Sequence, residues 1–556
     1  MRAAPQLPIM VAETPGVTES AMGGGLEGAE RTSRETALWN PHMGSPDRIV
    51  NSVKSMADAR GRDMNNNDGY TRGAVTINKD SIVGAHYRLN AKPVWKVLAS
   101  ITGKSFDETW ATEFQEMVEA RFDLIAESDD CWLDASGTNT FTELIRLGVG
   151  GAVLGGEIIA AAEWLKDDPR RPLKTAVQMV SAARMSNPNG QADDEFLRRG
   201  VAINARGKPQ GYWFREAHPG DYYASVKSWQ WRYIPARKPW GRRQIIHIYE
   251  QQEPGQSRGI ADIVSVLKNM RMTKHFDELT LQQAVINASY AAAIETEMPP
   301  DAVYSAMGGN SGSENFTAAM GSYMGMLSAY FGAANNVTID GVKIPVLPPG
   351  TSMKTQALGT PGGMGGDYGK SLLRHTCAAL GISFEEFSRD FSGISYSGLK
   401  GAFASTDKTM KAKKKGTADR LANGIYSLVL EEEIANGNVP LPRGVSRQAF
   451  YLPLAKEAFC KATWVGAGKG QIDELKETQA AILRIASGLS TYEIEVSRLG
   501  YDFRDIYAQQ VRERKAREVG QLVFDLSSNK PSSGGAAEDP KANNDNGQNN
   551  QEDDEL

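Results

Sequence analysis

The chain has 556 residues, more than one hydrophobic core normally supports, so several domains or subdomains are expected. Its formal net charge is −5 at pH 7, but residues 527–556 alone carry seven acids against two lysines, so the rest of the chain is close to neutral. Because neutralisation of phosphates supplies most of the affinity of tight nucleic-acid binders, this balance excludes a strongly basic binder and predicts that any contact with DNA is local and weak.

A helix, a turn and a second apolar stretch are expected after the N-terminal tail. Residues 1 to about 35 show no periodicity and are predicted to be disordered. After Pro46, apolar residues recur at helical spacing until a turn at 65–69. A second apolar stretch then runs to Val83, and another helix is expected at 106–127. The apolar residues of the first pattern are Ile49, Val53, Met56 and Ala59.

The part from 140 to 249 is predicted to be α+β. Helix-like and strand-like apolar residues alternate up to Glu163 around two glycine pairs. The most apolar run, 147–156, is short and glycine-rich, and since a membrane span takes about 20 apolar residues, we expect a buried core segment there. Strand patterns bounded by turn residues follow at 200–204, 210–215, 231–234 and 244–249.

No secretion signal, disulfide framework, metal site or cofactor is expected. Prolines and acids interrupt the N-terminal apolar residues, which disfavours a signal peptide. None of the six histidines has HExxH or HxxxH spacing. The three cysteines are few, distant and odd in number, which fits a soluble protein of a reducing compartment. They are Cys131, Cys377 and Cys460.

A long helix is expected at 261–297, because this stretch has neither glycine nor proline and two prolines stop it. Between 298 and 369 the chain becomes rich in glycine and methionine. The other elements predicted in this half are a helical island at 316–334, strand-like residues at 337–347, helices at 472–487 and 491–522, and a disordered acidic tail at 527–556.

Six lysines stand against a single acid, Asp407, on a stretch that is predicted to be helical. A continuous helix from about 397 to about 433 would rise roughly 55 Å at ~1.5 Å per residue. Such a run is most often a solvated helix face, but it also fits a surface that follows a nucleic-acid backbone or spans a subunit interface. Gly416 and Gly424 each cost about 1 kcal/mol relative to alanine inside a helix, so we expect a kink beyond the last lysine.

Three motifs resemble catalytic sites but fail in detail. A phosphate-binding loop ending at 369–371 needs glycine where Met364 stands, so we expect a flexible loop ahead of a helix. A nucleophile elbow at 393–397 needs glycine at its last position, which is serine. The adjacent acids at 385–386 and 431–433 do not face one another on a helix and are expected to be solvated. No catalytic residue is therefore expected.

Aromatic residues interleaved with basic ones near residue 230 allow two interpretations. They fit a platform on which single-stranded nucleic acid stacks. Alternation at period two more simply indicates a half-buried strand with a basic solvent face, which we favour. The residues are Trp229, Trp231, Tyr233 and Trp240 with Lys227, Arg232, Arg237, Lys238, Arg242 and Arg243.

Several short segments carry a family signature through their order and spacing. They are 66–70, 80–84, 132–137, 155–157, 207–209, 218–219, 254–259, 348–350, 380–390, 396–397, Trp464, 472–473 and 476–477. Together, over about residues 40 to 525, they resemble the portal proteins of tailed bacteriophages, specifically the lambda type. The chain departs from that family at the start of the lysine helix, where Gly398 replaces a serine and Lys400 stands nearest an expected arginine.

The resemblance implies an α+β phage portal fold with wing, stem, clip and crown regions and long helices around a central channel. The implied regions are a wing at 40–262, a stem helix at 263–297, a clip at 298–366, a second stem helix at 367–382, a tunnel loop at 383–397, a long wing helix with its return at 398–469 and crown helices at 470–526, between disordered tails at 1–39 and 527–556.

The resemblance also implies a non-enzymatic function. Such proteins form a ring, usually of twelve subunits, at one capsid vertex, through which double-stranded DNA is packaged and ejected. The implied partners are further copies of the chain, the passing DNA, the terminase large subunit, the major capsid protein and scaffold, and a head–tail connector, without a membrane. The implied location is the virion, after assembly in the host cytoplasm.

Two other classes stay open as hypotheses. An enzyme acting on nucleotides or nucleic acid, with a degenerate phosphate-binding loop near Gly369, is the alternative, although the broken spacing disfavours it. A monomeric DNA-binding adaptor predicts a basic body, which the composition lacks.

A conduit must let DNA slide, so its contacts should be weak and repeated around the ring. We expect the tunnel loop and the lysine helix to line or border the channel, with the acids of the loop repelling the DNA backbone. The expected channel residues are Phe384, Glu385, Glu386, Phe387, Arg389, Asp390, Lys400, Lys408, Lys411, Lys413, Lys414 and Lys415.

Overall fold

The computed structural model describes residues 38–224, 226–290, 337–339, 342–344, 365–470 and 473–521, together with residues 321 and 325. The chain divides into two compact units, Met1–Thr478 and Gln479–Leu556, and each is described by itself. The acidic tail 527–556 lies outside the described residues, as do residues 1–37 of the N-terminal tail and most of the segment expected at 298–366.

Two helices open the first unit and meet at Asp68. α1 (Pro46–Asn67) begins after Ser45, and α2 (Gly69–Ile82) begins after Asp68. In both cases the side-chain oxygen of the preceding residue accepts a hydrogen bond from a backbone N–H of the first turn, which satisfies a donor that the helix leaves unpaired. The helix predicted after Pro46 is confirmed as α1 but includes residues 65–67 of the predicted turn, and the second apolar stretch is the helix α2.

α1 exposes one apolar stripe and buries a mixed face, on which charged residues lie beside Val50, Ala57 and Met64. The apolar side chains that predicted it, Ile49, Val53 and Met56, are 50%, 47% and 57% exposed. On the opposite side the charged residues Lys54 and Asp58 are buried. Lys54 pairs with Glu157 on the sheet beneath and with Asp58 on its own helix, whereas nothing described covers the apolar stripe.

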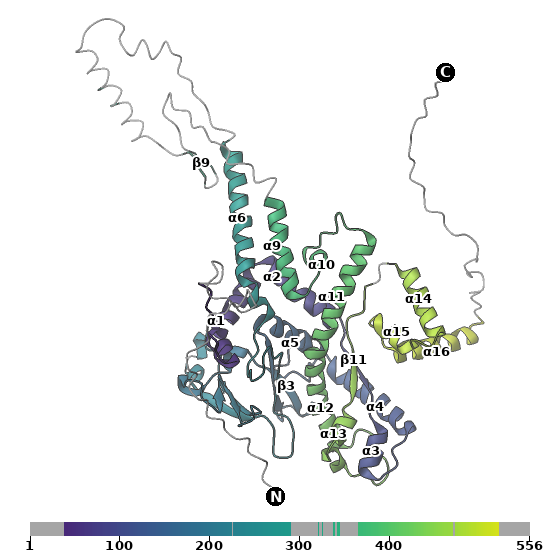
Figure 1. Ribbon diagram of the computed structural model, residues 1–556. Coiled ribbons are helices and arrows are strands. Elements are labelled where there is room, and N and C mark those ends of the chain that lie inside the picture. Colours follow the sequence, from purple (N-terminus) through teal and green to yellow (C-terminus); the bar gives the residue numbers. More distant parts are fainter. Residues whose placement is uncertain are drawn as a thin grey trace, which may run out of the picture. The chain divides into compact units, whose positions relative to one another are not determined.

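The centre of the first unit is a sheet of three antiparallel strands in the order β3-β2-β8 (Figure 1). Successive side chains of a strand point to opposite faces, and β2 buries both sets. Ile158 lies in the large core under the helices, whereas Ile159 lies in a smaller core shared with a second sheet. The strands are β2 (Glu157–Trp164), β3 (Thr175–Met179) and β8 (Ile245–Tyr249).

The second sheet is a four-stranded antiparallel meander in the order β4-β5-β6-β7. Its buried side chains, among them Val201 and Phe214, pack against the three-stranded sheet. All four strands predicted from the sequence in this region are confirmed, as β5 to β8. The strands of this sheet are β4 (Leu197–Arg198), β5 (Val201–Ile203), β6 (Pro209–Arg215) and β7 (Trp231–Pro235).

Two helices cover the other face of the central sheet. α5 (Phe141–Gly155) packs on β2, and α12 (Ala418–Asn436) packs on β3, β8 and α5. At Gly424 a Cβ atom would lie 2.7 Å from the Ile246 side chain, so glycine there permits the close approach of α12 to β8. The apolar run at 147–156 is thus part of a core helix and of its C-cap. Every helix in the described part of the chain is too short or too polar to cross a membrane.

The lysine helix is two helices. α11 (Tyr396–Gly416) ends where Thr417 takes the backbone angles φ −116° and ψ −75°, and α12 follows. The expectation of one continuous rod is therefore wrong, whereas the kink expected beyond Lys415 is confirmed. The break lies next to Gly416 and not at Gly424, because Gly424 is held in helix by its packing on Ile246.

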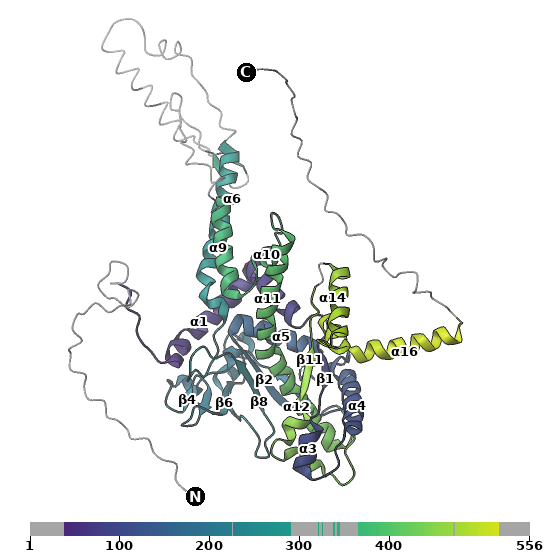
Figure 2. The same cartoon turned by 45° about the vertical axis from the view of Figure 1, so that its right-hand side comes forward.

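α6 (Leu267–Tyr290) and α9 (Gly365–Leu380) rise side by side away from the central sheet (Figures 1 and 2). An edge contact between Phe276 and Tyr368 joins them, with ring centroids 5.9 Å apart. The helix predicted at 261–297 is confirmed in part: its first residues form a 3-10 turn instead, and residues 291–297 lie outside the described part.

The remaining elements of the first unit are shorter. β1 pairs with β11, which joins residues far apart in the sequence. The bounds are α3 (Trp95–Thr102), α4 (Glu108–Ala126), α10 (Phe384–Ser388), α13 (Ala455–Phe459), β1 (Arg88–Ala91), β9 (Val337–Ile339), β10 (Val342–Ile344), β11 (Ala462–Val465), and the 3-10 helices η2 (Ala182–Arg184), η3 (Pro188–Gly190), η4 (Tyr222–Ala224), η5 (Lys227–Trp229), η6 (Asp262–Ser265) and η7 (Arg447–Tyr451).

The second unit consists of the end of α14 (Glu474–Ala486), then α15 (Tyr492–Arg498) and α16 (Phe503–Val519). The single helix predicted at 491–522 is therefore wrong, because the chain turns at Gly500 with φ +84°. A hydrogen bond from Arg484 holds the pKa of Glu495 at about 2, so this ion pair fastens α14 to α15.

Candidate functional site

α11 carries a stripe of exposed lysines. Four of its six lysines are exposed, at spacings of eight, eleven and fifteen residues from the first, which places them along one face of the helix. At about 1.5 Å per residue the stripe is roughly 22 Å long. Asp407 lies 2.7 Å from one of them, Lys411. This lysine stripe consists of Lys400, Lys408, Lys411 and Lys415.

The other two lysines, Lys413 and Lys414, point toward the core. Lys413 pairs with Asp262 at 3.1 Å, and Lys414 donates to Asp419 and to the Trp464 carbonyl, both at 2.8 Å. Their side chains are 22% and 21% exposed. Of the six lysines that were expected at the channel, the structure thus brings four together and places two in contacts that hold α11 to the rest of the unit.

The segment expected as a loop at 383–397 begins with the short helix α10. Phe387 is buried and stacks on Tyr70, with ring centroids 5.7 Å apart. Phe384 lies beneath the Arg374 guanidinium, and Glu386 accepts a hydrogen bond from Ser383. The first four expected channel residues, 384 to 387, therefore lie on a helix that is packed against its neighbours.

The exposed loop is residues 389–395. Arg389 stands at its start with φ +57° and an exposed side chain. Asp390 accepts hydrogen bonds from Ser392 Oγ at 2.5 Å and from its N–H at 3.0 Å, and these bonds lower the pKa of Asp390. Phe391 is 48% exposed on this loop and was not among the expected channel residues. An aromatic residue directly before a serine and a glycine is unusual in a loop and could have drawn attention to it.

Neither catalytic motif forms a catalytic site. The 369–371 segment lies inside α9, so its backbone amides belong to a helix and do not converge on an anion. The expectation of a flexible loop there is wrong, because the helix already begins at Gly365. Ser395 is the N-cap of α11 and accepts a hydrogen bond from the Gly398 N–H at 3.2 Å, a structural role.

The three consecutive acids of α12 are buried and not solvated as expected. Glu431, Glu432 and Glu433 are 4%, 5% and 4% exposed. Because consecutive helical residues point in different directions, each meets a different partner, as buried charges require. The partners are Arg242 and Tyr451 for the first, the backbone N–H groups of Lys174 and Thr175 for the second, and Arg121 for the third.

A buried charge cluster fastens α1 to the central sheet. The Glu157 side chain, at the start of β2, has no exposed surface. Arg258 Nη2 lies 2.5 Å from it, Lys54 Nζ 3.3 Å and His247 Nε2 3.0 Å. Desolvation by itself raises the pKa of Glu157, but Arg258 and Lys54 outweigh it and hold the pKa well below the usual range. We call these four residues the Glu157 cluster.

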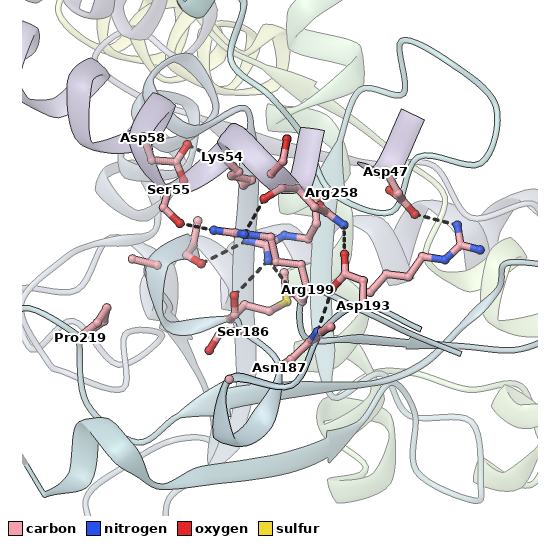
Figure 3. A pocket seen from close by; sticks show the side chains of 18 of the residues that line it. Asp47, Lys54, Ser55, Asp58, Ser186, Asn187, Asp193, Arg199, Pro219 and Arg258 are labelled. Atoms are coloured by element: carbon pink, nitrogen blue, oxygen red, sulfur yellow. Dashed lines mark hydrogen bonds and ion pairs between the residues drawn. The ribbon is translucent and has the colours of Figure 1, made fainter. Parts of the chain in front are cut away.

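The cluster borders a cavity of about 1020 Å³ between α1 and the second sheet (Figure 3). Figure 3 shows Lys54, Ser55 and Asp58 pointing from α1 toward Arg199 and Arg258. Arg199 donates to Ser55 Oγ and to the Asn51 carbonyl. These groups bind one another, so they hold α1 against the β4–β5 hairpin. Sequence reasoning missed the cluster, although Glu157 and Arg258 lie in two of the segments that carried the family resemblance.

Stability is expected to fall as the pH drops below about 6.5, the usual histidine pKa. Burial lowers the pKa of His247, so the unfolded chain binds a proton there before the folded chain does, and the free energy of unfolding decreases as the pH falls. Thermal melts between about pH 8 and 5 measure this. His218 also has a lowered pKa, so the difference between the parent and a His247→Gln variant isolates His247; identical pH profiles for both would contradict the assignment.

Of the aromatic and basic residues near 230, Trp231, Arg232 and Tyr233 lie on one strand. β7 is confirmed, with Trp231 partly buried and Arg232 and Tyr233 exposed. The Arg215 guanidinium lies 5.6 Å from the Trp229 ring and 4.9 Å from the Trp231 ring. A cation of the same chain therefore already lies over the two rings on which a base would have to stack. The interpretation as a partly buried strand is therefore the better one. Within the described residues no three His, Cys, Asp or Glu side chains are grouped as around a metal ion.

Comparisons with known proteins agree along nearly the whole chain. Residues 32–414 match the family model described as "Phage portal protein, lambda family". The chain is 35% identical over 500 residues to the "Portal protein" of Escherichia phage N15, covering 90% of each chain. It is also 35% identical over 484 residues to "Portal protein B" of Escherichia phage lambda, covering 87% of this chain and 88% of that one.

More distant matches are to neck structures of gene transfer agent particles. One, "Neck of empty GTA particle computed with C6 symmetry", shares 12% identity with a TM-score of 0.36 and covers 85% of this chain and 99% of its own. The family membership rests on the sequence relatives. The chain therefore belongs to the lambda family of phage portal proteins, which are structural proteins of the virion and not enzymes.

Proposed function

We propose that copies of this chain form a closed ring, usually of twelve, at one capsid vertex, and that double-stranded DNA passes through the ring during packaging and ejection. In this ring α6 and α9 are the stem helices, residues 389–395 are the tunnel loop, and the lysine stripe borders the channel. The crown is α14 to α16, and residues 298–366 form the clip.

The lysine stripe is the observation that carries the channel assignment. Four cations on one exposed face give a local positive surface on a nearly neutral chain, although Lys411 pairs with Asp407 at 2.7 Å and Lys415 lies 3.8 Å from Asp419. A ring repeats that surface around the duplex. Because each subunit adds only a few phosphate contacts, the DNA is attracted without being held in place.

We further propose the partners that a portal needs in assembly. These are the terminase large subunit, the major capsid protein and scaffold during assembly in the host cytoplasm, and the head–tail connector afterwards. The support for them is family membership alone.

Negative-stain imaging of the purified chain tests the ring directly. Closed rings with a central hole are the expected result. Monomers at high protein concentration would contradict the proposal.

Reversing the charge of the lysine stripe is expected to leave ring assembly intact and to reduce packaged DNA per particle about tenfold, because the channel then repels phosphates. The variant carries Lys400→Glu, Lys408→Glu, Lys411→Glu and Lys415→Glu, and DNA per particle is measured after packaging in cells. The matched control reverses four exposed lysines elsewhere, Lys104, Lys166, Lys208 and Lys469. Equal DNA content in both variants would contradict the proposal that the lysine stripe borders the channel.

A further inference from the structure

α1 carries a stripe of exposed apolar side chains. Ile49, Val53 and Met56 stand four and seven residues apart, so they lie along one helix face, and each is about half exposed. Arg48 and Arg60 flank them, both exposed and without an ion pair to any described residue. We call these five residues the α1 stripe. Exposed apolar surface of this kind marks an interaction site, because its burial is favourable.

α4 carries a second stripe of the same length and opposite charge. Met117 and Leu124 are 46% and 76% exposed, and Ala120 lies exposed between them. Their spacing of three and seven residues again follows one helix face. This α4 stripe also includes three exposed acids that form no ion pair with described residues: Glu113, Glu116 and Asp123.

The two stripes lie on opposite flanks of the first unit. In both views α1 is on one side of the sheet β3-β2-β8 and α4 is on the other (Figures 1 and 2). An interface between different patches on opposite sides of a subunit is head-to-tail, the type of interface that builds a ring when the rotation between neighbours closes. An α1–α1 or α4–α4 contact would instead oppose like charges, which is costly.

We propose that α1 of one copy packs against α4 of the next copy around the ring, apolar side chains against apolar side chains and Arg48 and Arg60 against the acids of the α4 stripe. This inference rests on the proposed ring and names a surface through which the ring closes. It also gives the exposed apolar stripe a partner: the Glu157 cluster holds the opposite face of α1 on the sheet and leaves the α1 stripe for the neighbouring subunit. Asp63 is the exposed acid of α1, and its carboxylate accepts a hydrogen bond from Asn67 Nδ2 at 2.8 Å, so it already has a partner within its own helix.

Cysteine cross-linking tests the contact in assembled rings. Val53→Cys and Ala120→Cys, placed together in one chain, put a thiol at the centre of each stripe, so the test does not depend on the direction in which the helices cross. Mild oxidation of rings is expected to give a ladder of covalently linked subunits on a non-reducing gel. Two of the native cysteines, Cys131 and Cys377, are buried, and the unmodified chain supplies the background.

Each single-cysteine variant is the matched control, because a head-to-tail contact brings two different positions together. A ladder requires both substitutions. Rings without a ladder would overturn the α1–α4 contact and leave the proposed function standing, as would happen if residues 1–37 of the same chain covered the α1 stripe. Dimers from the Val53→Cys variant alone would show an α1–α1 contact, which would also overturn the α1–α4 contact. Failure of the unmodified chain to form rings would overturn the proposed ring and this contact with it.

Charge reversal gives an independent readout. Arg48→Glu with Arg60→Glu, or Glu113→Lys with Glu116→Lys, is expected to lower the yield of rings about tenfold. All four changes in one chain exchange the charges across the interface and are expected to restore the yield. Circular dichroism verifies that each variant is folded. If the chain with all four substitutions gave no higher yield of rings than the chains with two, the pairing of these charges would be contradicted.

Discussion

Replacing Glu157 by glutamine is expected to lower the free energy of unfolding of the first unit by about 3–5 kcal/mol, the cost of leaving buried charges without a partner. Glutamine keeps the shape but removes the charge that Arg258 and Lys54 share. Both cations are 1% exposed, so water cannot replace the lost carboxylate. Thermal and urea unfolding followed by circular dichroism measure the loss.

Glu163→Gln is the matched control on the same strand. Glu163 is partly exposed, so this change is expected to cost less than about 0.5 kcal/mol. Combining Glu157→Gln with Lys54→Met should cost less than the sum of the two single changes, because the second removes one of the cations that the first leaves unpaired. If Glu157→Gln lowered the free energy of unfolding by less than about 1 kcal/mol, the remaining cations must have found other partners or water. That result would contradict the statement that water cannot replace the lost carboxylate.

Replacing Gly156 by alanine is expected to be of similar severity, about 4 kcal/mol or more. Gly156 caps α5 with φ +73°, a conformation that costs an L-residue roughly 1–2 kcal/mol. A Cβ atom there would lie 2.2 Å from the Ile260 carbonyl carbon and 2.4 Å from the Ala261 nitrogen. These are backbone atoms, so no side-chain rotation relieves the overlap, and α5, β2 and the segment before η6 must separate.

Gly103→Ala separates backbone strain from steric overlap. Gly103 caps α3 with a similar φ of +63°, but nothing lies within 4 Å of its would-be Cβ atom. This variant is therefore expected to lose only the conformational term, roughly 1–2 kcal/mol. Equal losses for the two glycine variants, measured by urea unfolding, would show that the contact with residues 260–261 does not constrain the fold.

Local patterns predicted much of the secondary structure, because periodicity and caps act over a few residues. The strands β5 to β8 and the helices α1 and α4 follow from such patterns. Boundaries were less predictable. The single helix expected at 491–522 is interrupted at Gly500, and the 369–371 segment is helical because α9 begins upstream of it.

The sides on which residues lie were harder to predict than the elements that carry them. The six lysines of α11 look equivalent in sequence, yet Lys413 meets Asp262 and Lys414 meets Asp419, whereas the lysine stripe faces solvent. Likewise, Glu431 to Glu433 have the composition of a solvated acidic run and are buried. Their partners, such as Arg121 and Arg242, lie hundreds of residues away in the chain.

The sequence by itself determined the family of this protein, its neutral body, its lysine-rich helix and the place where that helix breaks, since these are properties of composition, residue order and local conformation. Only the tertiary structure decided which charges are buried and which remain free. Burial of a charge depends on partners that distant segments bring close, as α1, β8 and the segment before η6 do for Glu157. For the same reason periodicity could not predict that Ile49, Val53 and Met56 of α1 are exposed while Lys54 is buried.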